Sequence, residues 1–334
     1  MPDLLLEVRD LKTHFQLDDG VVKAVDGVSF SVERGTTVGL VGESGCGKSI
    51  LSHSLLKLVP RPGKVVDGEI RFKRRDGKTV DVARMHPTGR AIREMRGREM
   101  AMIFQEPMTS LSMFYTIGEQ IGEGIIRHFK VSKKEARLRA IEQLKRVAMP
   151  NAEARVDAYP FQLSGGMRQR AMIAMALACE PELLIADEPT TALDVTTQAQ
   201  ILRLLKQLKA DSGMSMLMIT HDLGVVAETC QRVVVMYLGT VAEEAPVELL
   251  FEDPLHPYTR ALLRSIPKLG HSKDEPLAPI EGTVPDPYNR PVGCPFHTRC
   301  PEKIAGVCDA IYPERRQLAD GRSVSCHLYN EVAS

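Results

Sequence analysis

The chain has 334 residues, of which 43% are hydrophobic, and it carries 43 basic and 43 acidic side chains. This length suggests one large domain with an appendage, or two domains, and the balanced charge argues against nucleic acid or anionic lipid as a partner. No run of about 18 apolar residues occurs, the first residues lack the layout of a signal peptide, and an odd number of cysteines, seven, disfavours a closed disulfide framework.

The N-terminal residues predict paired β-strands. Residues 4–8 are strand-like, and residues 21–32 carry β-branched side chains interrupted by Asp26-Gly27, which is a turn signal. Phe15 lies between these segments, upstream of the first Gly-rich motif. Its ring fits two roles equally well at this stage: it could stack on a purine, or it could be a half-buried strand residue.

Residues 42–49 match the phosphate-loop pattern G-x-x-x-x-G-K-[ST] at each position. They follow a β-branched run, 37–41, and precede an apolar segment, 50–58, that reads as a helix. The glycines let several backbone N–H groups turn toward one anion, and the helix start adds its positive dipole end. The motif therefore predicts that Lys48 reaches the β- and γ-phosphates and that the Ser49 hydroxyl binds Mg²⁺. The residues expected to line the nucleotide here are Gly42, Glu43, Ser44, Gly45, Cys46, Gly47, Lys48, Ser49 and Ile50.

The middle of the chain changes character after residue 104. Residues 66–104 alternate short strand-like pieces with polar connections, and the apolar run 101–104 ends at Gln105. Residues 110–180 are rich in helix formers, and apolar residues recur at an approximately helical period within 133–148. We interpret the segment 106–180 as a helical subdomain inserted between strands of an α/β core.

A second helix start suited to an anion follows at residues 163–170. Ser164 can cap this helix, and Gly165 and Gly166 free the backbone at its N-terminus. Standing alone, this segment would be read as an ordinary capped helix.

Residues 183–188 read as a strand buried on both faces that ends in two carboxylates. Asp187 is placed to hold Mg²⁺ beside the phosphate loop, and Glu188 is placed to polarise an attacking water. Asp194 lies in the turn before a helix at 195–210, and a further strand at 214–220 ends at His221. At that strand end a contact from His221 to the γ-phosphate is expected. Residues 232–238 predict one last strand.

These pieces, in this order, resemble the ATP-binding subunit of an ABC transporter over residues 4–250. The run 163–167 looks like the ABC signature, with Met167 where the familiar form has Gln. The resemblance implies a P-loop NTPase core of ABC type with an antiparallel β subdomain and a helical subdomain. It also implies an ATPase whose ligands are ATP and Mg²⁺.

The resemblance further implies a role for each residue of the catalytic site. Phe15 would stack on adenine, Gln105 would sense Mg²⁺ and the attacking water, and Asp187 would serve the metal. Glu188 would be the general base, and His221 would hold the γ-phosphate.

A dimer is also implied, because one subunit offers only half of a site. Asp194 would sit at the dimer seam, and Ser164, Gly165 and Gly166 would complete the site of the opposite subunit. Further implied partners are two membrane-spanning permease subunits and a periplasmic or extracellular solute-binding protein. The location implied is the cytoplasmic face of the cell (inner) membrane, where the subunit would be peripheral.

Residues 253–263 look like the extension found in oligopeptide and dipeptide permease ATP-binding subunits, and the proline-rich segment 264–293 supports a boundary. We expect an ATP-binding domain at 1–255 and a C-terminal extension at 256–334. This resemblance predicts an ATPase that powers di- or oligopeptide import. Nickel, glutathione or an oligosaccharide are alternative solutes, and a soluble non-transport ABC ATPase and a nucleotide-binding scaffold without turnover are alternative functions.

The tail holds four clustered cysteines: Cys294, Cys300, Cys308 and Cys326. Such a cluster favours a metal site that staples a loop-rich segment too short to build its own core. Zinc usually shows C-x₂₋₄-C pairs, which are absent, and four thiolates suit a [4Fe–4S] cluster equally well. The dipeptide permease branch resembles this pattern and binds such a cluster, which favours iron–sulfur, whereas His297 and His327 keep zinc open.

Overall fold

The structure is a computed structural model that describes residues 3–106, 110–191, 193–265 and 280–329. Its N-terminal part is a four-stranded antiparallel sheet. The strands, in spatial order, are β2 (Gly20–Glu33), β1 (Leu4–Leu17), β4 (Gly63–Lys73) and β5 (Thr79–Asp81).

The expected pairing of the first two strands is confirmed, but the expected turn at Asp26-Gly27 is wrong. The chain turns at residues 18–19 instead, and β2 runs on through Gly27. Lys12 pairs with Asp26 and Leu11 pairs with Val28, so Gly27, with φ 82°, is the extra residue of a β-bulge. The glycine that signals a turn in the sequence therefore serves to bend a long strand.

A second sheet of eight strands forms the core. Its strands, in spatial order, are β11 (Arg316–Gln317), β12 (Ser323–Val324), β10 (Thr240–Pro246), β9 (Arg232–Tyr237), β3 (Thr37–Val41), β8 (Ser215–Ile219), β7 (Leu183–Asp187) and β6 (Met100–Ile103). The five strands from β9 to β6 are parallel, so their carboxyl ends meet at one edge, where ligands of such sheets bind. Strands β3, β7 and β8 are buried at every position, which explains their unbroken apolar runs.

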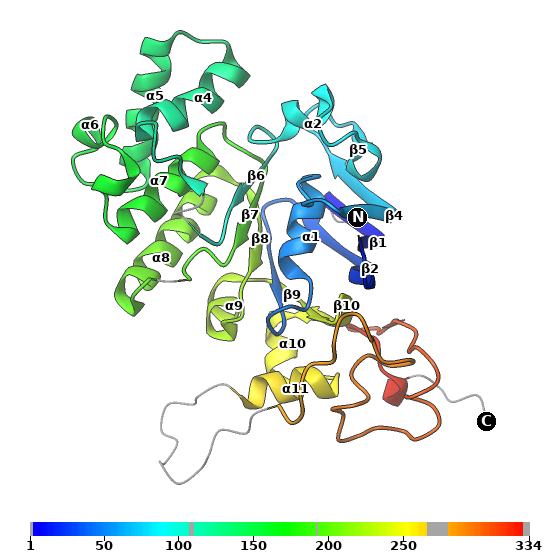
Figure 1. Ribbon diagram of the computed structural model, residues 1–334. Helices are drawn as coiled ribbons and strands as arrows, with labels where there is room; N and C mark the ends of the chain where they lie inside the picture. The colour runs from blue at the N-terminus through cyan, green and yellow to red at the C-terminus, as the bar shows by residue number, and fades with distance from the viewer. Residues whose placement is uncertain (1–2, 107–109, 192, 266–279, 330–334) are drawn as a thin grey trace.

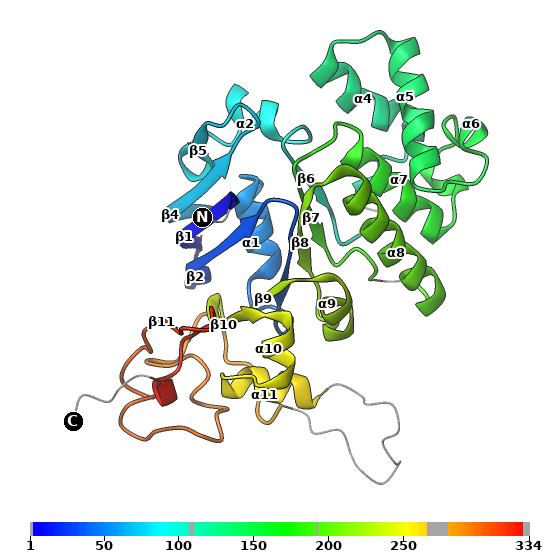
Figure 2. The same ribbon diagram turned by 180° about the vertical axis from the view of Figure 1, so that it is seen from behind.

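Helices cover both faces of the core sheet. Helix α1 (Lys48–Leu55) lies on the side of the antiparallel sheet, whereas α7 (Gly165–Leu177), α8 (Val195–Ser212) and α9 (Leu223–Thr229) lie on the opposite side (Figures 1 and 2). Among the described residues, no helix is both long and apolar enough to cross a bilayer.

A helical block lies between β6 and β7, in the segment where the sequence predicts helices. It consists of α4 (Ile117–Phe129), α5 (Lys133–Arg146), α6 (Ala152–Arg155), the 3₁₀ turn η2 (Pro160–Gln162) and α7. Helix α4 begins at a capping box in which Thr116 accepts the N–H of Glu119 while the Glu119 carboxylate accepts that of Thr116. The expected residues 107–109 of this block lie outside the described part of the chain.

Two expectations about neighbouring segments are wrong. Between β5 and β6 the chain forms the 3₁₀ turn η1 (Val82–Arg84) and helix α2 (Arg90–Met95), where only strand-like pieces were expected. The strand at 232–238 is also not the last, because β10 follows it. The adjacent carboxylates Glu243 and Glu244 hide this strand in the sequence, since such pairs are usually exposed. Both are buried here: Glu243 accepts the N–H groups of Leu255 and His256 at 2.9 and 2.8 Å, and Glu244 pairs with arginines.

The tail packs on the body of the protein, as expected. Beyond α10 (Val247–Glu252) and α11 (Pro257–Arg264), strand β12 pairs with β10 and so enters the core sheet. The chain ends its described part in the 3₁₀ turn η3 (His327–Tyr329). Arg290 also pairs with Asp26 of β2 at 2.8 Å. Figures 1 and 2 show this tail, in orange and red, beside β10 and the end of β2.

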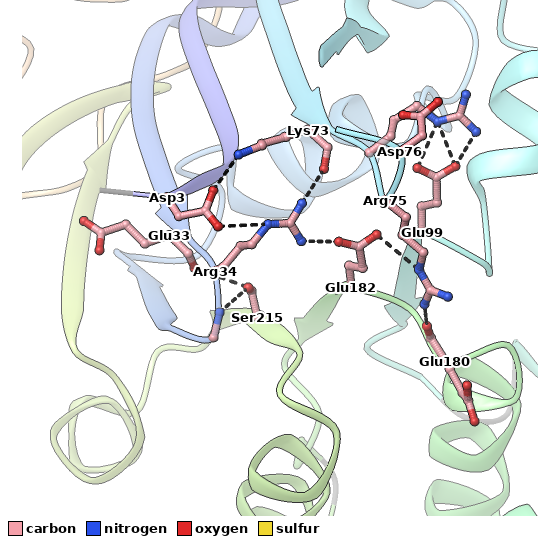
Figure 3. Close-up of polar contacts among 12 residues, drawn as sticks. Asp3, Glu33, Arg34, Lys73, Arg75, Asp76, Glu99, Glu180, Glu182 and Ser215 are labelled. Carbon is pink, nitrogen blue, oxygen red and sulfur yellow. Dashed lines mark hydrogen bonds and ion pairs between the residues drawn. The ribbon is translucent and has the colours of Figure 1, made fainter. Parts of the chain in front are cut away.

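A polar network joins the antiparallel sheet to the start of β7 (Figure 3). Glu182, which directly precedes β7, pairs with Arg34 and with Arg75, the latter at 3.2 Å. Arg34 also donates to the Lys73 carbonyl at 3.0 Å, and Lys73 pairs with Asp3 at 2.8 Å. The network therefore fixes the antiparallel sheet at the edge of the core opposite to Asp187.

Replacing Glu182 by Gln is expected to lower the free energy of unfolding by about 1–3 kcal/mol, because Arg34 and Arg75 each lose an ion pair and Arg34 keeps only the one with Asp3. Urea denaturation of the full chain measures this change. Glu94→Gln is the matched control: its pair with Arg90 lies on an exposed helix, and its loss is expected to cost less than about 0.5 kcal/mol. Equal effects of the two substitutions would contradict the prediction.

Candidate functional site

The phosphate loop connects β3 to α1 and is folded around its own lysine. Lys48 is buried, and its Nζ donates to the carbonyl oxygens of Gly42 at 2.8 Å and Glu43 at 3.0 Å. Gly42 and Gly47 have φ of 150° and 100°, and a Cβ on either would lie 2.2 or 2.1 Å from a backbone oxygen of another strand. Only glycine fits these two positions, so the loop is preformed against β2 and β9.

A carboxylate from β7 reaches the start of α1. Asp187 lies at the carboxyl end of β7, and its two oxygens accept hydrogen bonds from Ser49 and Ser52, each at 3.4 Å. The side chain is buried, and this burial raises the pKa of the Asp187 carboxyl. Ser49 and Asp187 thus form the hydroxyl and carboxylate pair that a Mg²⁺ ion beside a phosphate requires.

Glu188 is the centre of a second cluster. Its carboxylate accepts hydrogen bonds from Gln105 Nε2 at 3.0 Å and Thr191 Oγ1 at 2.8 Å, and its other oxygen lies 3.3 Å from His221 Nδ1. Burial raises the pKa of the Glu188 carboxyl, but the hydrogen bonds from Thr191 and His221 outweigh burial, so the net pKa lies below its usual range. Glu188 is therefore ionised at neutral pH and can accept a proton.

This second cluster unites three residues that were separate motifs in the sequence. Gln105 follows β6, Glu188 follows β7, and His221 follows β8. Thr191 was missed by the sequence analysis, because a lone Thr after a strand carries no motif. Glu188 itself has φ 47°, a conformation that non-glycine residues seldom adopt outside constrained sites.

The signature segment lies apart from the phosphate loop. Ser164 caps α7 through the N–H of Met167 at 3.4 Å, and a Cβ on Gly166 would lie 2.9 Å from Thr197 at the start of α8. Asp194 caps α8 through the N–H of Thr197 at 3.0 Å. Helices α7 and α1 lie on opposite sides of the core strands in both views (Figures 1 and 2). The structure thus places the signature beside Asp194.

Phe15 is half-buried near the end of β1. Its ring lies against Gly63, where a Cβ would come within 2.6 Å of the ring. Phe15 pairs with Val22, two residues before Ala24, whose carbonyl closely approaches Gly47 of the phosphate loop. The ring is therefore close in the fold to the loop, and its stacking on adenine stays a prediction.

The four tail cysteines are free, and each sulfur accepts a backbone N–H group. Cys294 accepts from Phe296, Cys300 from Glu302, Cys326 from Leu328, and Cys308 from Ile304 at 3.4 Å. Burial, and then the neighbouring cysteines, raise the pKa of Cys294 to about 11 and of Cys326 to about 12. Among the described residues, however, no three His, Cys, Asp or Glu side chains are close enough together to hold a metal ion.

In each of the two tail histidines, one ring nitrogen forms a hydrogen bond with a backbone carbonyl. His297 Nδ1 lies 2.8 Å from the Cys294 carbonyl, and His327 Nε2 lies 2.8 Å from the Ile311 carbonyl. Each bond fixes a ring and leaves its other nitrogen available, which is the arrangement common to metal-binding histidines.

Two family models match this sequence. The model described as "ABC transporter" matches residues 25–191, and "Oligopeptide/dipeptide transporter, C-terminal region" matches residues 242–308. The first covers the phosphate loop, signature and both carboxylates, and the second covers α11 and three of the four tail cysteines.

Curated relatives match nearly the whole chain. The chain is 51% identical to "Probable peptide ABC transporter ATP-binding protein y4tR" of Sinorhizobium fredii, over 99% of this chain and 97% of that one. It is 48% identical to "Dipeptide transport ATP-binding protein DppD" of Bacillus subtilis, over 98% and 96%. "Oligopeptide transport ATP-binding protein AppD" of the same organism is 52% identical, over 98% and 97%.

Solved structures agree with these matches. A dimeric structure of MJ0796, a bacterial ABC transporter cassette, superposes with a TM-score of 0.63 and 27% identity, over 72% of this chain and 98% of that one. CbiO1 of Clostridium perfringens, part of an ABC transporter complex, gives 0.61 and 29%, over 75% and 92%. By its sequence, its fold and its site, the chain belongs to the peptide ABC transporter ATP-binding proteins with an oligopeptide/dipeptide-type C-terminal region, and it is an ABC transporter ATPase.

Proposed function

We propose that this ATPase powers the import of di- or oligopeptides through a membrane ABC transporter. The observation that carries its catalytic part is the Glu188 carboxylate, held at once by Gln105 and His221 beside the Asp187–Ser49 pair. The peptide substrate is supported by relatives named as dipeptide and oligopeptide transport ATP-binding proteins, which match over 96% and 97% of their length.

The proposed chemistry uses the two carboxylates differently. ATP would lie on residues 42–50, with Lys48 on its β- and γ-phosphates and Mg²⁺ at Ser49 and Asp187. Glu188 would take a proton from a water molecule while the oxygen of that water bonds to the γ-phosphorus. The bond between the γ-phosphorus and the β–γ bridging oxygen would break, and ADP would leave. Gln105 would orient this water, and His221 would hold the γ-phosphate.

A second ATP-binding subunit, either the same chain or a distinct homologue, would complete the site. The separation of Ser164, Gly165 and Gly166 from the phosphate loop supports this, because these residues would then close over the γ-phosphate on the partner's loop and not on their own. Asp194, beside them, would lie at the seam. Two subunits arranged head to tail would enclose two ATP molecules, and hydrolysis would weaken the closed state.

Two permease subunits would dock on the helical subdomain, at the cytoplasmic face of the cell (inner) membrane. A groove of about 550 Å³ between α4 and α5 supports this placement, with Tyr115, Ile126 and Val156 among its lining. Phe114, next to Tyr115 in the chain, is 88% exposed, which suits an apolar side chain that becomes buried when a partner protein binds. A periplasmic or extracellular solute-binding protein would complete the transporter and deliver the peptide.

For the tail, we propose a [4Fe–4S] cluster on Cys294, Cys300, Cys308 and Cys326, with zinc as the alternative metal. The N–H groups bonded to all four sulfurs support this, because such bonds stabilise thiolates that bind a metal centre. When bound, the group would cross-link the loops of the extension. Stoichiometric zinc and no iron or sulfide in an anaerobically purified full chain would reject the cluster, and loss of iron in Cys308→Ser would support it.

The domain limits at 1–255 and 256–334 form part of the same proposal. Glu243 of the first domain accepts the N–H groups of Leu255 and His256, so the two parts meet tightly at this boundary.

The transport function is tested with the complete transporter in proteoliposomes. We expect di- or oligopeptides, presented with the cognate solute-binding protein, to stimulate ATP hydrolysis and to accumulate on the ATP side. Nickel, glutathione and an oligosaccharide are the comparison solutes. Stimulation by one of these and not by peptides would reject the substrate, and hydrolysis by the chain without any permease-dependent uptake would favour a non-transport ATPase.

A further inference from the structure

The C-terminal extension contacts one residue of the phosphate loop through hydrogen bonds and an ion pair. That residue is Glu43, the second of the loop, whose carbonyl oxygen also holds Lys48 at 3.0 Å. The contacts come from Tyr258 of α11 and from Arg299, which are 215 and 256 residues further along the chain. Because Glu43 bonds to Lys48 directly, its position bears on the lysine that the proposed function assigns to the phosphates.

The contact with Arg299 is a two-pronged ion pair. Arg299 donates from its two terminal nitrogens to the two oxygens of Glu43, at 2.7 and 3.1 Å. The Arg299 side chain is 3% exposed and that of Glu43 is 24% exposed. An arginine bound to both oxygens of a carboxylate fixes its orientation as well as its charge, and burial shields the pair from salt.

The contact with Tyr258 acts on the backbone. The Glu43 N–H donates to the Tyr258 hydroxyl at 2.8 Å. The Tyr258 ring is fully buried in an aromatic cluster with Tyr237, at 4.7 Å between ring centres, and Phe296, at 5.3 Å. Side chain and backbone of the same loop residue are therefore both held by the extension.

Arg299 is itself held in place by the fold of the cysteine region. Its Nε donates to the Glu281 carbonyl at 3.0 Å, and a terminal nitrogen donates to the Ile280 carbonyl at 3.3 Å. It lies in the tight turn between Cys294 and Cys300, where its N–H donates to the Phe296 carbonyl at 3.0 Å. The conformation of this turn thus decides whether the guanidinium reaches Glu43.

We propose that Arg299 and Tyr258 are positioning residues of the ATPase, through which the folded extension holds the phosphate loop in its nucleotide-binding shape. Arg299 has a second effect, since it neutralises a carboxylate that would otherwise stand free beside the bound phosphates. This inference rests on the proposed function of the loop. By this proposal the cysteine region contributes to nucleotide binding, in addition to packing on the core of the protein.

The test is the affinity of the full chain for Mg–ADP, measured by isothermal titration calorimetry. ADP fills the phosphate loop without a γ-phosphate, so closure of a dimer does not enter the measurement. Arg299→Gln is expected to raise Kd by about tenfold. Tyr258→Phe, which removes one buried hydroxyl and keeps the ring, is expected to raise Kd by about threefold.

The double variant Glu43→Gln/Arg299→Gln separates this role from a merely structural one. It lacks the carboxylate that Arg299→Gln leaves unpaired, so we expect it to bind Mg–ADP several-fold more tightly than Arg299→Gln alone. A double variant that binds no better than Arg299→Gln would contradict the charge effect, and the same result together with wild-type affinity in Tyr258→Phe would overturn the proposal.

Arg322→Gln is the matched control. Arg322 is a largely buried arginine of the same extension that pairs with Asp253 at 3.0 Å and does not contact the loop, so its Kd should stay at the wild-type value. If Arg299→Gln does not fold, Tyr258→Phe serves as the test instead. Wild-type affinity of this variant for Mg–ADP would reject the proposed positioning of the loop by the extension. A wild-type chain that binds no Mg–ADP would reject the proposed function itself, which is a separate outcome.

Discussion

Replacing Glu188 by Gln is expected to lower the rate of ATP hydrolysis by about 100- to 1000-fold. The amide keeps the shape of the side chain but cannot take a proton from water, whereas the carboxylate is held ionised by Thr191 and His221. ATP binding should persist, because Glu188 does not belong to the phosphate loop. The variant should therefore accumulate as a closed, ATP-bound dimer. Phosphate release and size-exclusion chromatography with ATP measure the two effects.

Glu228→Gln serves as the control for this prediction. Glu228 lies on the exposed side of α9, and its loss is expected to leave both rate and oligomeric state unchanged. A Glu188→Gln protein that hydrolyses ATP at the parent rate would show that another group is the base.

Replacing Lys48 by Ala is expected to weaken ATP binding by about 100-fold, the effect of losing charged hydrogen bonds to the phosphates. The structure holds the ammonium group of Lys48 in the loop before any nucleotide arrives, through the carbonyls of Gly42 and Glu43. Little reorganisation is then needed on binding, so most of the interaction is realised as affinity. Calorimetric titration of the full chain with Mg–ATP measures the loss.

Lys57→Ala is the control for Lys48. Lys57 follows the same helix, but its Nζ donates to the Ala83 carbonyl at 2.8 Å, away from the loop. Its removal is expected to leave the affinity for ATP unchanged. Equal losses in the two variants would point to a general effect on folding, and an unchanged affinity in Lys48→Ala would contradict the assignment of the loop.

The proximity of Glu188 and His221 could be predicted from the residues, because each ends an apolar run and the carboxyl ends of parallel strands meet at one edge. For Gln105 the prediction came from the family resemblance alone. Thr191 could not be found in this way, since its hydrogen bond to Glu188 depends on the local turn after β7.

The two wrong predictions about strands, at Gly27 and at Glu243, have a common cause. Gly27 signals a turn and forms a bulge, and Glu243 signals exposure and is buried as a hydrogen-bond acceptor. In both positions the partner lies in another segment of the chain, which is β1 beside Gly27 and the loop at Leu255 and His256 beside Glu243. Local propensity is overridden where tertiary pairing satisfies the same polar groups differently.

The sequence alone determined the nucleotide machinery, because phosphate and metal binding need fixed residue types at short, fixed spacings, as in residues 42–49 and 183–188. Only the tertiary structure decided how the tail relates to that machinery. The strand pairing of β12 with β10 and the ion pair of Arg299 with Glu43 join segments far apart in the chain. Such contacts leave no periodic or spaced signal in either segment, since their geometry exists only after the chain has folded.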